Sequence, residues 1–258
     1  MGTILGLDVG SMTTKAVVLR DGTMAGWHLI ASAGDYRGAA DKAKGDVLAK
    51  SGVSEDNLTK VVVTGYGADL VANADQKVSE IVAHAVGTHH LFSSARTLIE
   101  VGGQSTRVAK IGAGGKPLDF LISEKCAAGS GRMLQMIARV LHVKLEDIGP
   151  LSLRSHKPVS FTTSCAVFME SEAVSRVAEG SPKEDILAGI HEALASKIAN
   201  MINRVGLELD CVITGGGARD SGLVSRIQET LGVDLLVPEV PQVTAALGAA
   251  LSGDSRGN

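Results

Sequence analysis

The chain begins with three short runs of apolar and β-branched residues separated by turn-forming residues. The runs read TILGLDV, TKAVVLR and a third stretch that ends at Ile30. Runs of this length and composition are typical of β-strands, and the Asp21-Gly22 pair before the third run is a favoured hairpin turn. Residues 3–30 are therefore predicted to form three strands joined by a glycine turn and a hairpin.

The same pattern recurs about 92 positions further along the chain. LDVGSMTTKAV aligns with IEVGGQSTRVA, which matches Asp8 with Glu100 and Lys15 with Arg107. In both copies a glycine follows the acid by two residues, and a second hairpin turn is expected near residues 112–116. An acid, a glycine and a base in the same order favour a duplicated strand-turn-strand unit over a chance match.

Amphipathic segments follow each copy of this unit. After the first copy we expect helices within 37–51 and 75–91, with a strand at Lys60–Thr64 between them. After the second copy the segment EDILAGIHEALASKIANMINRVG has helical spacing of its apolar residues, which are Ile186, Ile190, Leu194, Ile198, Ile202 and Val205. A strand over DCVIT then meets a glycine turn, and another helix is expected to begin near Asp220.

Composition supports a mixed α/β protein and restricts its partners. Of the 258 residues 45% are hydrophobic and only 3% aromatic, and the net charge is −3 without any run of Lys or Arg. We therefore expect no nucleic acid and no membrane as partners. The N-terminus lacks the pattern of a signal peptide, which predicts a cytoplasmic protein, where cysteines serve as ligands, nucleophiles or core thiols rather than disulfide partners.

The first glycine turn has the composition of a phosphate-binding loop. It begins at Asp8 and continues through Gly10, Ser11, Thr13, Thr14 and Lys15. Small residues let backbone N–H groups approach phosphate oxygens, the carboxylate can hold a water of hydrated Mg²⁺, and the lysine can pair with phosphate. Neither the Walker pattern nor GxGxxG occurs in the sequence, and a plain glycine hairpin remains the alternative for this loop taken alone.

Two further glycine loops complete the set. The second offers the Glu100 carboxylate for Mg²⁺ and the Gln104 amide to orient an attacking water, with Gly102 and Gly103 between them. The third comprises Gly215, Gly216, Gly217 and Ala218 after a predicted strand, where bare backbone can pack against a ribose or an adenine ring. Each loop is weak evidence by itself.

Together, the three loops resemble those of the superfamily of acetate kinase, sugar kinases, heat-shock chaperones and actin. That resemblance implies an α/β fold of two duplicated ribonuclease-H-like domains with ATP in the cleft between them. We place the domains at 1–95 and 96–258, and expect a final helix over 243–252 that packs back on the first domain.

Two of the three cysteines are predicted at positions that suit a reactive thiolate or a metal-cluster ligand. Cys126 opens EKCAAGSGRMLQMIARVL and Cys165 opens TTSCAVFMESEAVSRVAEG, so both are predicted where a loop enters an amphipathic helix. Unpaired N–H groups and the helix dipole stabilise a thiolate or an anionic cluster there. A small buried thiol is the alternative for either cysteine alone, and Cys211, within the apolar strand CVIT, is predicted to be such a core residue.

The whole chain resembles the activators of 2-hydroxyacyl-CoA dehydratases and benzoyl-CoA reductases. The specific marks are KCAAGSGR at 125–132 and SCAVFMESE at 164–172; shorter ones are VTGYG at 63–67, SEIVAHA at 79–85, GGQ at 102–104, AGIHEALASKIAN at 188–200 and AALGAAL at 245–251. The resemblance implies an ATPase with one 4Fe-4S cluster per homodimer, held by Cys126 and Cys165 of both subunits. Four thiolates per cluster agree with two per chain.

The resemblance also implies protein partners and a direction of electron transfer. A ferredoxin or flavodoxin would reduce the cluster, ATP with Mg²⁺ would bind and be hydrolysed to ADP, and an electron would pass to an iron-sulfur dehydratase or reductase component. Two positions depart from the family pattern, because Glu100 and Ser105 stand where aspartates are usual. The alternatives are a small-molecule kinase of the same fold without a cluster, and an actin-like or chaperone-like module without catalysis.

Overall fold

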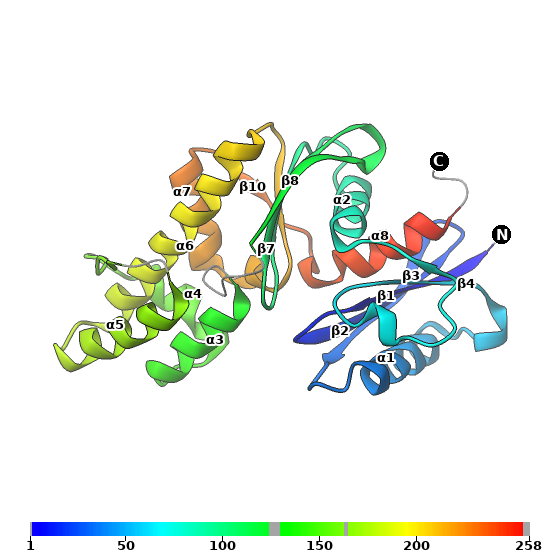
Figure 1. Cartoon of the computed structure of the whole chain (residues 1–258), viewed down its shortest axis with the longest axis horizontal. Coiled ribbons are helices and arrows are strands. Elements are labelled where there is room, and N and C mark those ends of the chain that lie inside the picture. The colour runs from blue at the N-terminus through cyan, green and yellow to red at the C-terminus, as the bar shows by residue number, and fades with distance from the viewer. Residues whose placement is uncertain (1, 124–129, 163–164, 255–258) are drawn as a thin grey trace. The chain divides into compact units, whose positions relative to one another are not determined.

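The computed structural model describes residues 2–123, 130–162 and 165–254. The chain divides into two compact units (Figure 1). Unit 1 comprises 1–96, the turn at 111–119 and 238–258, and unit 2 comprises 97–110 and 120–237. None of the helices in the described part of the chain is long and apolar enough to cross a membrane.

Unit 1 contains a mixed sheet that, over the described residues, has the strand order β3-β2-β1-β4-β5. The strands are β1 (Thr3–Val9), β2 (Thr13–Arg20), β3 (Thr23–Ala31), β4 (Leu58–Thr64) and β5 (Gln76–Lys77). The predicted hairpin is confirmed: Asp21 and Gly22 both have the positive φ angles that its turn requires. β4 runs parallel to β1, and their register places Thr64 opposite Asp8.

Helices cover both faces of this sheet (Figure 1). α1 (Tyr36–Ser51) packs on one face, and its N-cap Asp35 accepts a hydrogen bond from the backbone N–H of Gly38. α8 (Thr244–Gly253) covers the other face and in turn packs against α2 (Glu80–Leu91). A Cβ at Gly248 would overlap the carbonyl oxygen of Ala83, so this glycine lets the two helix backbones touch.

Unit 2 is built around a second sheet with the order β10-β9-β6-β7-β8 among the described residues. Its strands are β6 (Thr97–Val101), β7 (Thr106–Ile111), β8 (Pro117–Ser123), β9 (Cys211–Thr214) and β10 (Leu235–Leu236). The helices are α3 (Gly131–Val140), α4 (Ile148–Ser152), α5 (Ala166–Ala178), α6 (Lys183–Val205) and α7 (Ser221–Leu231). All six residues that predicted the long helix are buried along α6.

The two sheets repeat one another, which confirms the predicted duplication. β1 and β6 each pair antiparallel with the next strand and parallel with a later one. Glu100 lies opposite Arg107 and Thr214 in its sheet, in the way that Asp8 lies opposite Lys15 and Thr64. The α/β fold class expected from the three glycine loops is therefore confirmed.

Candidate functional site

The first glycine loop of unit 1 is centred on an ion pair. Lys15 donates a hydrogen bond of 2.8 Å from Nζ to Oδ2 of Asp8, and both side chains are largely buried. The loop closes where the backbone N–H of Gly10 donates to the carbonyl oxygen of Thr13 over 3.1 Å. Lys15 therefore holds the Asp8 carboxylate in a fixed position within the loop.

A serine that lies outside the predicted loop holds the loop in position through hydrogen bonds. The Ser32 hydroxyl donates a 2.7 Å hydrogen bond to the carbonyl oxygen of Gly10 and lies 2.9 Å from the hydroxyl of Thr14. Ser32 is buried just after β3. Sequence reasoning missed this residue, because a lone serine after a strand carries no motif.

Unit 1 also contains a fourth glycine loop next to Asp8. Gly65 follows β4 with φ +94°, and a Cβ there would lie 2.6 Å from Oδ1 of Asp8. Gly67 donates its backbone N–H to the carbonyl oxygen of Val9 over 2.8 Å. This loop was noticed in the sequence only as VTGYG; its signal was the match between TGYG at 64–67 and TGGG at 214–217.

The second and third glycine loops lie against one another in unit 2. Arg107 donates a 2.8 Å hydrogen bond to Glu100, and both side chains are buried. Gly215 has φ +83°, and a Cβ at this position would lie 2.5 Å from the carbonyl oxygen of Val101 and 3.1 Å from Oε1 of Glu100. Only a residue without a side chain fits there, so the third loop lies directly against β6, the strand that contains Glu100.

Other predicted residues of these loops lie at the surface. Gln104 and Gly216 are exposed, whereas Gly217 and Ala218 are buried. A Cβ on Gly216 would have no neighbour within 4 Å. The exposed backbone and amide are free of packing against the described residues around them and can meet a ligand.

Two buried hydroxyls mark the ends of the parallel strands. Within the described ranges, neither Thr64 Oγ1 nor Thr214 Oγ1 has a hydrogen-bond partner. Each lies opposite the acid of its own sheet in the strand register. A buried polar atom without a partner is costly, so both positions suit a site that is completed by a bound ligand or water.

Cys165 lies where the sequence predicted it, as the N-cap residue of α5. It is half-buried. On the same helix, the carboxylate of Glu172 accepts hydrogen bonds from the backbone N–H and the hydroxyl of Thr162. Glu172 was not singled out from the sequence beyond its place in SCAVFMESE.

Of the other two cysteines, the structure describes only Cys211. Cys126 lies outside the described residues. Cys211 is fully buried in β9, as predicted, and this burial raises the pKa of its thiol to about 12. Within residues 2–123, 130–162 and 165–254, no group of three or more His, Cys, Asp or Glu side chains is arranged to hold a metal ion.

Residues 5–253 match the BadF/BadG/BcrA/BcrD ATPase family. The chain belongs to this family. It is 37% identical over 247 residues to the 2-hydroxyisocaproyl-CoA dehydratase activator of Clostridioides difficile, covering 96% of this chain and 93% of the relative. It is also 36% identical to the (R)-2-hydroxyglutaryl-CoA dehydratase activating ATPase of Acidaminococcus fermentans, covering 96% of this chain and 95% of that protein.

Solved structures of family members superimpose closely. The C. difficile activator, solved with bound ADPNP, has a TM-score of 0.93 at 36% identity and covers 99% of this chain and 95% of its own. A ROK family glucokinase from Streptomyces griseus shares the fold alone, with a TM-score of 0.58 at 14% identity, covering 97% of this chain and 99% of that one. This chain is therefore an ATPase of the BadF/BadG/BcrA/BcrD family, and the small-molecule kinase alternative rests on a fold-level likeness only.

Proposed function

We propose that this family ATPase is a homodimeric one-electron donor that activates an iron-sulfur dehydratase or reductase acting on an acyl-CoA. Two relatives with near-complete coverage are named as activators of 2-hydroxyacyl-CoA dehydratases. The observation that carries the proposal for this chain is Cys165 at the N-cap of α5, within the segment SCAVFMESE. A kinase would have no use for a thiol in that position.

In this proposal the glycine loops bind ATP together with Mg²⁺. Asp8 and Glu100 orient the hydrated Mg²⁺, and Lys15 and Arg107 hold these carboxylates in place through the observed ion pairs. Gly10, Ser11 and Thr13 face the phosphates together with Gly102 and Gly103. The hydroxyl of Thr14 is buried against Ser32, so this residue supports the loop from its other side. Gln104 orients the attacking water, and Gly215, Gly216, Gly217 and Ala218 receive the nucleoside.

Of the two proposed cluster ligands, Cys165 is described by the structure, and its position fits an iron-sulfur cluster. Iron-sulfur clusters are held by cysteine thiolates, and a helix N-terminus stabilises the negative charge of such a ligand. Cys165 meets both conditions, being a half-buried thiol that caps α5. Cys126 would be the second ligand from each chain, so that one 4Fe-4S cluster joins two subunits; when bound, it supplies a low-potential electron.

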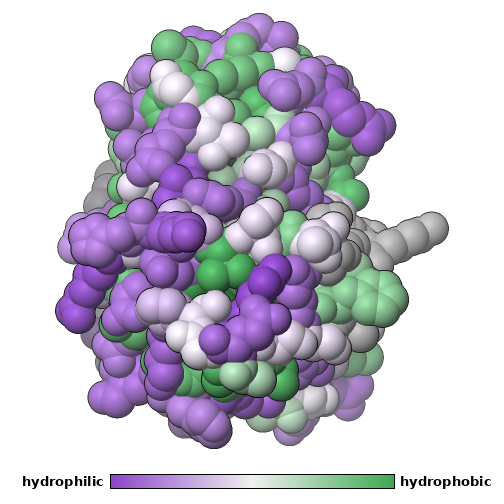
Figure 2. Space-filling model, turned by 90° about the vertical axis from the view of Figure 1, so that its left-hand side faces the viewer, coloured by the Kyte–Doolittle hydropathy of each residue, from purple (hydrophilic) through white to green (hydrophobic). Residues whose placement is uncertain are grey.

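Helix α5 has a surface that suits contact with a second copy of the chain. Phe168, Val174 and Val177 expose 66%, 52% and 44% of their surface on this helix. Figure 2 shows the side of the molecule that lies at the left of Figure 1, where hydrophobic residues are interspersed with hydrophilic ones. Of these, Phe168 lies one turn after Cys165, and a large exposed apolar side chain near a proposed bridging cysteine supports a dimer contact there.

A direct link joins the second glycine loop to the helix that follows Cys126. The backbone N–H groups of Gly131 and Arg132, at the start of α3, donate to the carbonyl oxygens of Gly102 and Gly103 over 2.8 and 2.9 Å. Any shift of this loop on hydrolysis of ATP to ADP therefore pulls on the first turn of α3. A ligand shifts a conformational equilibrium only if it binds the two conformations with different affinity. These hydrogen bonds couple the nucleotide-binding loop to α3, so a nucleotide can favour one position of α3 over another.

The experiment that tests the proposal is anaerobic reconstitution with iron and sulfide. We expect about four irons per two chains, because each chain supplies two ligands. The reconstituted protein should accept an electron from reduced ferredoxin or flavodoxin and pass it to a dehydratase or reductase component only with ATP. Four irons on each monomer, or electron transfer that does not depend on ATP, would contradict the proposal.

A further inference from the structure

His191 occupies the centre of a hydrogen-bonded chain that none of the roles above uses. It lies in the middle of α6 and is only 1% exposed. Its Nδ1 is 2.9 Å from the hydroxyl of Ser152 at the end of α4, and its Nε2 is 3.1 Å from Oδ2 of Asp220. One imidazole thus connects α4 and α6 with the residue before α7.

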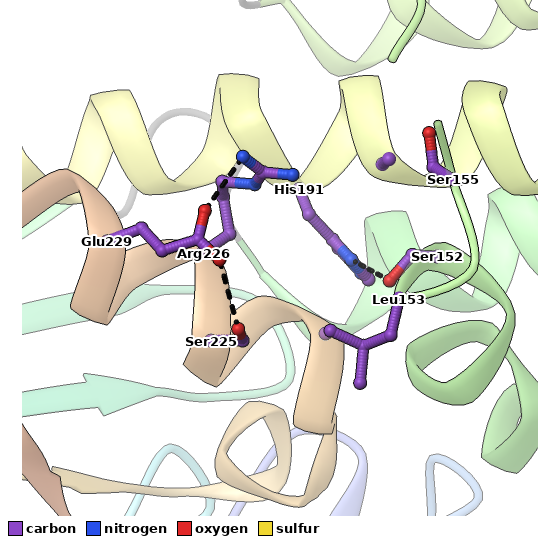
Figure 3. A pocket seen from close by; sticks show the side chains of 9 residues that line it. Ser152, Leu153, Ser155, His191, Ser225, Arg226 and Glu229 are labelled. Atoms are coloured by element: carbon purple, nitrogen blue, oxygen red, sulfur yellow. Dashed lines mark hydrogen bonds and ion pairs between the residues drawn. The ribbon is translucent and has the colours of Figure 1, made fainter. Parts of the chain in front are cut away.

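The imidazole lies beside a small polar pocket (Figure 3). The pocket has a volume of about 190 Å³, and Ser152, Ser155, His191, Ser225, Arg226 and Glu229 contribute polar groups to its wall. Arg226 pairs with Glu229 there over 2.9 Å, and the Ser225 hydroxyl donates to Glu229 over 3.3 Å. These ion-paired groups satisfy one another, so the pocket by itself indicates no ligand.

Asp220 connects this chain to the third glycine loop. Its Oδ1 accepts the backbone N–H of Leu223 over 3.0 Å, which makes it the N-cap of α7. Its own N–H donates to the carbonyl oxygen of Gly217 over 3.1 Å. Because a carboxylate can only accept, Nε2 of His191 must be the donor to Oδ2. The loop thus ends on a residue that two donors hold in place.

The hydrogen-bonded chain is tightly packed where it meets α7. A Cβ on Gly222, in the first turn of α7, would overlap the Ser152 hydroxyl and lie 2.8 Å from Nδ1 of His191. Loss of the hydrogen bond from His191 would therefore be felt as a shift of Asp220 and of the start of α7, since close-packed interiors transmit such changes.

We propose that His191 is a positioning residue for nucleotide binding, which acts through Asp220 to hold Gly215–Ala218 in the geometry that receives the nucleoside. This inference rests on the nucleotide role proposed above for that loop. His191 touches no substrate and takes no part in the chemistry. Contacts to the nucleoside are the same before and in the transition state, so the effect of a displaced loop falls on the KM for ATP rather than on kcat.

Two substitutions separate this role from simple packing. The amide nitrogen of His191→Gln reaches the position of Nε2 and keeps a donor for Asp220, whereas that of His191→Asn reaches only the position of Nδ1. We expect His191→Asn in the full-length chain to raise the KM for ATP about tenfold with kcat within about twofold, and His191→Gln to restore most of the loss. Ser225→Ala, in the wall of the same pocket, should keep the wild-type KM.

A second variant makes the test independent of how well His191→Asn folds. Asp220→Ser keeps an N-cap oxygen for Leu223 but cannot reach His191. It should raise the KM as His191→Asn does, and the double variant should be no worse than either single one, because both remove the same contact. Equal KM values for the Asn and Gln variants, or a lowered Tm with unchanged KM, would overturn the inference.

Measurements on Asp8→Ala show whether a negative result concerns only the role of His191 or the proposed nucleotide site as a whole. Binding of a fluorescent ATP analogue to the wild type and to Asp8→Ala tests whether the glycine loops form the nucleotide site at all. If Asp8→Ala abolishes turnover while His191→Asn leaves the KM unchanged, only the role of His191 is wrong. If Asp8→Ala has no effect on turnover, the site assignment itself is wrong.

Discussion

Arg107 and Glu100 form an ion pair of 2.8 Å in the interior of unit 2, with 7% and 4% of their side chains exposed. The pair repeats the one between Lys15 and Asp8, which is the same length but slightly more exposed. A buried charge without its partner is strongly destabilising. Each ion pair therefore contributes to the stability of its unit, and each contains a carboxylate that is proposed to orient Mg²⁺.

We expect Arg107→Met to destabilise the protein by about 3–5 kcal/mol, because it removes the cationic partner of the buried Glu100 carboxylate. Adding Glu100→Gln in the same chain should restore part of this loss. Urea unfolding followed by circular dichroism measures both. If the single variant unfolds at the wild-type urea midpoint, the pair is more hydrated than its burial indicates.

Asp8→Ala and Lys15→Ala should each lower ATP turnover by about a hundredfold, on the order of 3 kcal/mol of transition-state stabilisation. The iron content of reconstituted protein should stay the same, since no proposed cluster ligand lies in this loop. Phosphate release and iron analysis on one preparation provide the comparison. Wild-type turnover in either variant would remove that residue from the site.

Glu100→Asp should keep or raise ATP hydrolysis, because it restores the residue usual in the family and keeps the negative charge. Glu100→Gln should lower hydrolysis, since it removes the carboxylate proposed to orient Mg²⁺. Turnover as a function of Mg²⁺ concentration is the informative measurement. Identical curves for all three proteins would place Glu100 away from the metal.

Gly65→Ala should both destabilise the fold and reduce ATP turnover. The φ angle of +94° is strained for alanine, and the new methyl would lie 2.6 Å from Oδ1 of Asp8; such strain costs about 1–3 kcal/mol. Gly45→Ala is the matched control, because Gly45 is exposed within α1 and has no neighbour within 4 Å of an added Cβ. That control should gain about 0.5–1 kcal/mol of stability and keep full activity.

Cys211 and Cys165 should respond differently to alkylation and to substitution. The pKa of Cys211 is raised by burial to about 12 from 9.0, so its thiol stays protonated and unreactive at pH 8, while Cys165 of cluster-free protein reacts. Cys165→Ser should remove the cluster and Cys211→Ser should spare it. Mass spectrometry after iodoacetamide treatment, together with iron analysis, checks both expectations.

The raised pKa of Cys211 also predicts a pH dependence of stability. The unfolded chain loses this proton near pH 9, whereas the folded chain keeps it to about pH 12. Its contribution is therefore fully present below pH 9 and is lost as the pH rises toward 12. Cys211→Ala should show a shallower fall in the free energy of unfolding over that range than the wild type.

The sequence was sufficient where short-range chemistry decides the structure. Asp21-Gly22 could only be a hairpin turn, and the apolar spacing of α6 fixed its buried face over Lys183–Val205. The acid, glycine and base of the first loop predicted their counterparts in the second, and Cys165 was placed at a helix start. Each of these features depends on residues close together in the chain.

The features that escaped prediction depend on contacts between distant segments. Ser32 reaches back to Gly10, and Asp220 meets His191 across 29 positions. The loop at Gly65 became recognisable as a partner of Asp8 only when β4 was seen beside β1. Such pairings follow from sheet order and helix packing, which a local pattern does not contain.

The position of α8 on the sheet of unit 1 has a consequence for biosynthesis. The apolar residues Ile4, Val17 and Val62 face this helix, whose own residues lie near the other end of the chain. During translation, α8 cannot cover the second face of that sheet before Thr244–Gly253 have been synthesised and have left the ribosome. Unit 2 needs nothing beyond Val237 and can fold first, although its synthesis begins later. The nascent first unit is thus the part of the chain on which a holding chaperone would act.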